Sequence, residues 1–93
     1  MIGILTIHLR LPGCSSLKEK RGRLKPLLTR LHKEFNISSA EMELQDTWQD
    51  TIVACGMVGN DRVHLERSLQ TVARWLDENW TDMQVVNEHI ELI

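Results

Sequence analysis

Residues 2–11 read IGILTIHLRL, and large apolar side chains occupy every second position from Leu5 onward. A strand places alternate side chains on opposite faces of a sheet. One face of this segment therefore carries Leu5, Ile7, Leu9 and Leu11, and the other carries Ile4, Thr6, His8 and Arg10. The alternation predicts a first strand with one buried face, which ends at a Pro12-Gly13 turn.

Two helices are expected after this strand. Ser16 followed by Glu19 forms a capping box that begins the first helix. Its apolar stripe consists of Leu17, Leu24, Leu28, Leu31 and Phe35, with Leu27 alongside. Pro26 lies inside this stretch and predicts a kink or a shifted start. Asn60-Asp61 predicts the start of the second helix, whose stripe consists of Leu65, Leu69, Val72 and Leu76.

Three further strands complete the prediction. Residues 40–44 alternate apolar and acidic side chains, as expected of a half-exposed edge strand. Residues 51–59 are almost continuously apolar, which indicates a central strand. Residues 83–93 form the last strand, with Val86, Glu88 and Ile90 on one face and Val85, Asn87, His89 and Glu91 on the other.

The predicted order of elements is βαββαβ. Right-handed crossovers convert this order into an α+β ferredoxin-like sandwich, an antiparallel sheet with two helices on one face and the other face open. A chain of 93 residues has room for one core, so residues 1–93 are predicted to form a single domain.

Composition restricts where the protein works. No apolar run approaches the roughly 20 residues that span a bilayer, and Met1 leads directly into the first strand without an export signal. Cys14 and Cys55 have no spacing typical of a disulfide framework. We therefore expect a cytoplasmic protein with no membrane partner.

Charge is distributed unevenly along the chain. Residues 1–33 hold eight of the eleven Lys and Arg residues and one acid, whereas residues 34–93 hold three basic and twelve acidic residues, a net charge of +7 against −9. Such a division favours either a basic patch for an anionic partner or chains that associate through complementary halves.

The first helix and its approach form the main candidate for an anion-binding or RNA-binding surface. A helix N-terminus offers free N–H groups and partial positive charge to a phosphate. The candidate residues are Arg10, Ser15, Ser16, Lys18, Lys20, Arg21, Arg23 and Lys25. The alternative is an ordinary solvated helix face. The first and third strands lack Phe, Tyr and Trp, so base stacking on the open sheet face is not expected.

A second candidate surface is the polar connection that follows the edge strand. Its partner-contact candidates are Gln45, Asp46, Trp48 and Gln49. Trp48 either anchors a partner, as loop aromatics often do, or folds over the end of the sheet to close the core.

Little in the sequence indicates catalysis. Cys14 precedes a helix start and basic residues, which predicts a lowered thiol pKa, yet no neighbouring base accompanies it. The four histidines match no metal motif, although His8 and Arg10 add charge to the open face. We expect no enzyme, no cofactor, no metal and no small-molecule substrate.

Three motifs carry a family resemblance: SLKEKR at residues 16–21, FNIS at 35–38 followed by Ala40-Glu41, and QDTWQ at 45–49. Together they resemble the YlxP-like family of small bacterial proteins over nearly the whole chain. The resemblance implies a ferredoxin-like fold, no known catalytic activity, and genes placed beside translation-initiation and ribosome-maturation factors. Pro26 and Leu44 depart from the family pattern.

Two functional hypotheses follow from these observations. In the first, a non-enzymatic binding module docks its basic first helix on ribosomal or other structured RNA. In the second, a structural or adaptor protein binds itself as a homodimer, or another protein, through its edge strand or open sheet face. A small-anion enzyme that uses Cys14 or Ser15 is a distant third.

Overall fold

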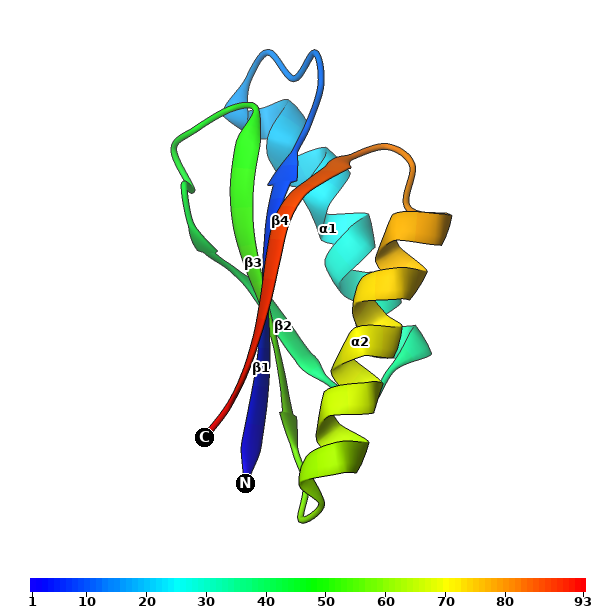
Figure 1. Ribbon diagram of the computed structural model, residues 1–93. Helices are drawn as coiled ribbons and strands as arrows, with labels where there is room; N and C mark the ends of the chain where they lie inside the picture. Colours follow the sequence, from blue (N-terminus) through cyan, green and yellow to red (C-terminus); the bar gives the residue numbers. More distant parts are fainter.

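The computed structural model describes all residues, 1–93. Its elements are β1 (Ile2–Arg10), α1 (Leu17–Glu34), β2 (Ser38–Glu43), β3 (Asp50–Val58), α2 (Arg62–Asn79) and β4 (Gln84–Leu92). The strands pair antiparallel in the order β2-β3-β1-β4, and both helices cover one face of this sheet (Figure 1). The predicted ferredoxin-like α+β fold is confirmed. Neither helix is long and apolar enough to cross a membrane.

The core lies between the sheet and the helices. Leu5, Ile7 and Leu9 of β1 are fully buried, as the alternation predicted, and they pack with Val53 and Cys55 of the neighbouring β3. The helices contribute their leucine stripes, which include Leu24, Leu27, Leu31, Leu69 and Leu76. Thr6, His8 and Arg10 alternate with the buried residues and therefore lie on the face that no helix covers.

Helix α1 begins where the capping box predicted. The Ser16 Oγ accepts a hydrogen bond from the Glu19 N–H at 3.0 Å, and the Glu19 carboxylate accepts one from the Ser15 N–H at 3.0 Å. Pro26 does not shift this start, and the helix continues through it to Glu34. The second helix is capped by Asp61, also as predicted.

Strand β4 corrects one prediction. Leu9 pairs with Val85 but His8 pairs with Asn87, so Val86 is an extra residue in a β-bulge. An extra residue reverses the alternation on one side of the bulge. Val85 therefore shares the helix-facing side with Glu88 and Ile90, where the sequence had placed Val86, and Val86 is exposed.

Candidate functional site

Lys20 is the most unusual residue of the structure, because its side chain is only 1% exposed. It lies four residues before Leu24 and seven before Leu27, so it shares the stripe of α1 that faces the sheet. The prediction that Lys20 contacts a phosphate is therefore wrong, since no external ligand reaches the buried ammonium.

The Lys20 ammonium is surrounded by oxygen atoms. Its Nζ donates to the carbonyl oxygens of Leu44, Thr47 and Asp50 at 2.6, 2.6 and 2.7 Å. It also forms an ion pair with the Glu41 carboxylate at 2.8 Å. A charge removed from water requires such compensation. We refer to these four oxygen-bearing groups as the Lys20 cage.

The carboxylate of the cage is held in turn by the sheet. Glu41 Oε2 accepts a hydrogen bond from the Thr51 Oγ1 at 2.6 Å. Glu41 reaches the cage because β2 directs it toward the helices, whereas Met42 and Leu44, the apolar members of the predicted strand, are exposed. The strand ends at Glu43, and Leu44 follows with a left-handed φ of 63°.

The cage fixes the connection between β2 and β3, residues 44–49. Besides the bonds to Lys20, the Thr47 N–H donates to the Leu44 carbonyl at 3.0 Å, and the Leu11 N–H donates to the Gln49 carbonyl at 2.8 Å. The Gln49 side chain donates to the Cys14 carbonyl at 3.4 Å. This connection and the one between β1 and α1 therefore lie together at one end of the molecule (Figure 1).

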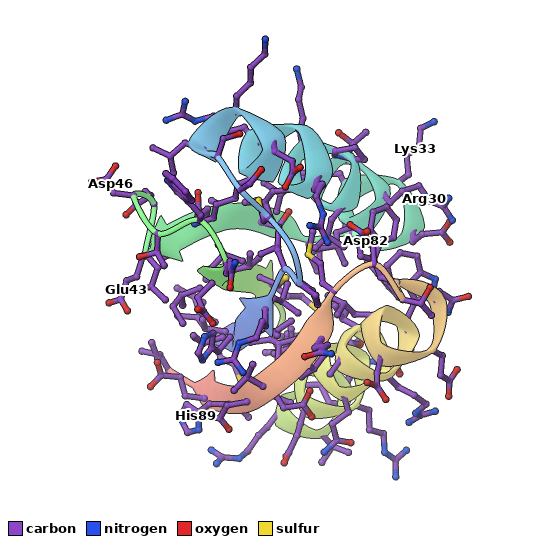
Figure 2. The ribbon with its side chains drawn as sticks, turned by 90° about the horizontal axis from the view of Figure 1, so that it is seen from above. Arg30, Lys33, Glu43, Asp46, Asp82 and His89 are labelled. Atoms are coloured by element: carbon purple, nitrogen blue, oxygen red, sulfur yellow. The ribbon has the colours of Figure 1, made fainter.

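Trp48 projects from this anchored connection and is 52% exposed. The interpretation in which it folds over the sheet to close the core is therefore wrong. Gln45 and Asp46 are exposed beside it, and Asp46 points outward at the margin of the molecule (Figure 2). All four partner-contact candidates are thus exposed, although the side-chain amides of Gln45 and Gln49 already donate to the carbonyl oxygens of Met42 and Cys14, at 3.2 and 3.4 Å.

Several other basic candidates are already paired within the chain. Arg23 donates to the Asp82 carboxylate, to its carbonyl and to the Pro12 carbonyl, at 3.0, 2.8 and 3.0 Å. Arg10 lies 3.3 Å from the Asp50 carboxylate. Arg23 therefore secures the fold with its whole guanidinium group, whereas Arg10 contacts Asp50 through Nε alone and keeps 49% of its side chain exposed on the open face.

Four cations of α1 remain exposed with no carboxylate within 4.0 Å: Lys33 in the last turn, and Lys18, Arg21 and Lys25 in the first half of the helix. Lys18, Arg21 and Lys25 are three and four residues apart, so they follow one face of the helix. Arg21 and Lys25 also border a shallow apolar groove with Leu24 and Leu28 of α1 and Glu41 of β2. We call Lys18, Arg21 and Lys25 the α1 cation row.

The N-terminus of α1 does not offer the phosphate site that the sequence predicted at Ser15 and Ser16. The carboxylate of Glu19 already accepts the Ser15 N–H, and the Ser16 hydroxyl accepts the Glu19 N–H. Hydrogen bonds from Cys14 and Ser15 lower the pKa of Glu19. An anion at this terminus would have to displace the chain's own carboxylate.

Cys14 also departs from prediction. Its thiol is buried and donates to the Ser16 carbonyl at 3.5 Å. Burial raises the pKa of this thiol, and the neighbouring Glu19 raises it further, because both disfavour a thiolate. The predicted lowering of the pKa is therefore wrong, and burial likewise raises the pKa of Cys55 to about 11.

Neither cysteine is expected to react with a thiol reagent while the protein is folded. Both are buried, and raised pKa values reduce the thiolate fraction at neutral pH. Ellman's reagent at pH 7.5 should label both thiols within minutes in denaturant but neither on that time scale in native buffer. Rapid native labelling of one thiol would contradict this assignment, and Cys14→Ser would identify which cysteine reacted.

Asp50 joins the open face to the anchored connection. Its carboxylate lies 2.9 Å from His8 Nε2 and 3.3 Å from Arg10 Nε, while its carbonyl accepts from Lys20. The hydrogen bond from His8, followed by the charge of Arg10, lowers the pKa of Asp50. Protonation of Asp50 therefore disfavours the folded state.

Asp50→Asn is expected to lower the free energy of unfolding by about 1 kcal/mol at pH 7, because asparagine accepts hydrogen bonds but carries no charge. A lowered folded-state pKa gives stability that is present above the unfolded-state pKa, about 4, and is lost as pH falls through the folded-state pKa. Urea unfolding from pH 7 to pH 3 should show the two proteins converging below about pH 4. A difference that stays constant over this range would show that the Asp50 charge does not contribute.

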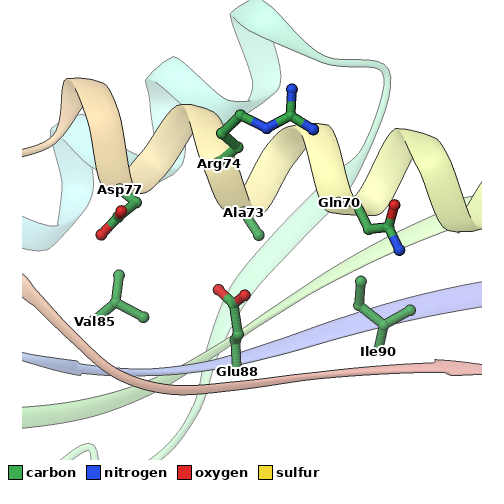
Figure 3. Close-up of a pocket in the computed structure, with 7 residues that line it drawn as sticks. All are labelled: Gln70, Ala73, Arg74, Asp77, Val85, Glu88 and Ile90. Carbon is green, nitrogen blue, oxygen red and sulfur yellow. The ribbon is translucent and has the colours of Figure 1, made fainter.

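A groove between α2 and β4 is the largest hollow, with a volume of about 440 Å³. Ala73, Val85 and Ile90 give it apolar walls, and Gln70, Arg74, Asp77 and Glu88 bring polar groups (Figure 3). Glu88 points from the edge strand toward the helix. Inward-pointing charges on edge strands discourage pairing with another chain, so we attribute Glu88 and the bulge at Val86 to protection of this edge.

The open face carries an apolar patch at one end of the sheet. Its shallow groove is lined by Ile2, Ile4, Ser38, Ser39, Ala40, Met42, Ala54 and Gly56. His8 and His89 lie on neighbouring strands of the same face, with His89 opposite Thr6. No group of three or more His, Cys, Asp or Glu side chains is arranged to hold a metal ion.

Sequence reasoning missed the Lys20 cage, although one signal was available. Among the basic residues near the start of α1, Lys20 alone falls in register with Leu24, Leu27 and Leu31. A lysine on an apolar stripe requires a buried acceptor, and Glu41 lies on a strand that flanks the helix. The three carbonyl oxygens of the cage left no such signal, because any residue supplies a carbonyl.

Comparison with known proteins identifies the family of the chain. Residues 2–90 match the family described as Protein of unknown function (DUF503). The chain is also 42% identical over 77 residues to the Uncharacterized protein YlxP of Bacillus subtilis (strain 168), an alignment that covers 83% of this chain and 84% of that protein. The YlxP-like resemblance is confirmed, and the chain belongs to the DUF503 family of proteins of unknown function.

Proposed function

We propose that this protein is a non-enzymatic RNA-binding module that docks on ribosomal or other structured RNA through the α1 cation row, assisted by the connection that carries Trp48. The proposal rests on one observation: the fold pairs some of the basic side chains of residues 1–33 with carboxylates and leaves the others unpaired. Of the eight basic residues in positions 1–33, Arg10, Lys20, Arg23 and Arg30 have carboxylate partners. Lys33 and the α1 cation row have none.

The position of the row supports a phosphate ligand. A helix rises about 1.5 Å per residue, so Lys18 and Lys25 are separated by about 10 Å along the axis. Long exposed side chains over such a span suit a run of backbone phosphates, which bind cations irrespective of sequence. The acids Glu43 and Asp46 lie at one margin of the molecule (Figure 2) and limit the footprint there. We place this role in the cytoplasm, where ribosomal RNA is found.

The test is a binding titration against small-subunit ribosomal RNA and intact subunits over a salt series. Three phosphate contacts predict that log affinity falls with log salt with a slope of about −2 to −3. Binding with such a slope supports the proposal. Absence of binding at low salt, or affinity independent of salt, would overturn it.

A second function is favoured by the apolar patch on the open face, which no element of this chain covers. In that case the protein is an adaptor or a homodimer that joins through the sheet. Sedimentation velocity over a concentration series distinguishes the two functions. A dimer that persists after charge reversal in the α1 cation row and dissociates on Met42→Asp, in a protein that binds no RNA, would favour this second function.

A further inference from the structure

The half-exposed indole of Trp48 is not explained by folding. An aromatic side chain contributes most to stability when it is buried, yet Trp48 leaves half of its surface in water. The other two tryptophans of the chain, Trp75 and Trp80, are partly buried against the core. Trp48 therefore differs from both in being presented to the solvent.

The backbone on each side of Trp48 is fixed. The preceding carbonyl, of Thr47, accepts from the buried Lys20 ammonium at 2.6 Å, and the following carbonyl, of Gln49, accepts from the Leu11 N–H at 2.8 Å. A platform whose backbone is already ordered loses little entropy when a ligand binds. Trp48 is thus presented on an anchored connection.

This platform is linked to two of the free cations through Glu41. The Lys20 ammonium that binds the Thr47 carbonyl also pairs with Glu41 at 2.8 Å, and Glu41 borders the groove that Arg21 and Lys25 line. An aromatic ring next to a row of cations is the combination that binds single-stranded nucleic acid, in which phosphates contact the cations and bases stack on the ring.

We infer that the preferred ligand is RNA with at least one unpaired base, which stacks on Trp48 while the adjoining backbone follows the α1 cation row. In a duplex the base faces are covered by their neighbours and are not available for stacking. The inference rests on the proposed function and narrows it, because the cation row alone would bind paired and unpaired RNA alike. The inference also places the stacking ring on the connection between β2 and β3, whereas the open face of the sheet carries no Phe, Tyr or Trp ring.

The experiment compares two RNA hairpins that differ by one nucleotide, a base bulged out of the stem of the second. Both are closed by a flexible linker without nucleotides, so that the fully paired hairpin offers no unpaired base. Fluorescence anisotropy of labelled RNA gives both affinities for the wild type, Trp48→Leu and Trp48→Phe. Loss of one base stack weakens binding by about 5-fold to 100-fold. Wild type should therefore prefer the bulged hairpin by about this factor, Trp48→Phe should retain most of the preference, and Trp48→Leu should lose it.

The salt series separates this inference from the proposed function. Trp48→Leu should keep the wild-type salt slope, because no phosphate contact has been removed. Equal binding of both hairpins by wild type, or an unchanged preference in Trp48→Leu, would overturn the inference and leave the RNA-binding proposal standing if the salt slope persists. Failure of wild type to bind either hairpin at low salt would overturn both.

Discussion

Lys20→Met is expected to lower the free energy of unfolding by about 3–5 kcal/mol, the cost of leaving one member of a buried ion pair without its partner. Methionine fills similar space but supplies no N–H, so three carbonyl oxygens lose their donor, and the Glu41 carboxylate loses its counter-charge and keeps only the hydrogen bond from Thr51. Domains of this size are stable by only about 5–15 kcal/mol. The variant should therefore be only marginally folded. Its free energy of unfolding is measured by urea unfolding in the presence of a stabilising osmolyte, which keeps enough of it folded at the start.

The matched control for this variant is Lys25→Met, which makes the same substitution five residues later on the exposed face of α1. It should change stability by no more than about 0.5 kcal/mol. Glu41→Gln in the Lys20→Met background should recover part of the loss, because it removes the uncompensated charge. A Lys20→Met protein as stable as its control would contradict the cage.

The charge reversal Lys18→Glu/Arg21→Glu is expected to remove most of the RNA affinity. Each phosphate contact contributes about one unit to the magnitude of the slope of log affinity against log salt. Losing two contacts should therefore change a slope of about −2 to −3 to a shallower slope, between about −1 and 0. Stability should be unaffected within about 0.5 kcal/mol because both side chains are exposed and unpaired. The measurement is the same salt-series titration, with unfolding curves alongside.

Arg62→Glu/Arg67→Glu on α2 provides the matched control, since both side chains are exposed and the change in net charge is identical. The control should keep the wild-type slope. Equal losses in the two double variants would indicate attraction to the overall charge of the protein and would contradict a localised site.

The architecture could be predicted from the sequence because its signals are periodic and local. The alternation of Leu5, Ile7 and Leu9 marks the buried face of β1, and both helix starts follow from side chains that cap their own N–H groups. The exchange of faces in β4 could not be predicted, because a bulge depends on pairing with β1 and leaves no regular pattern in the sequence.

The candidate site was predictable only in outline. Lys18, Arg21 and Lys25 were identified by charge, but charge alone did not separate them from Lys20 and Arg23, whose partners Glu41 and Asp82 are distant in sequence. Similarly, the exposure of Trp48 depends on carbonyl groups anchored by Lys20 and Leu11. Long-range pairing therefore decides which members of the basic segment remain free.

Chemical-shift mapping by NMR tests the location of the RNA site most directly. In 1H–15N spectra of the labelled protein titrated with the bulged hairpin, we expect perturbations at residues 18–28 and 44–50, including the indole N–H of Trp48 but not those of Trp75 and Trp80. Perturbations centred on Ile4, Ala40 and Ala54 of the open sheet face, or none at RNA concentrations that saturate binding, would contradict the site proposed on α1 and its neighbouring connection.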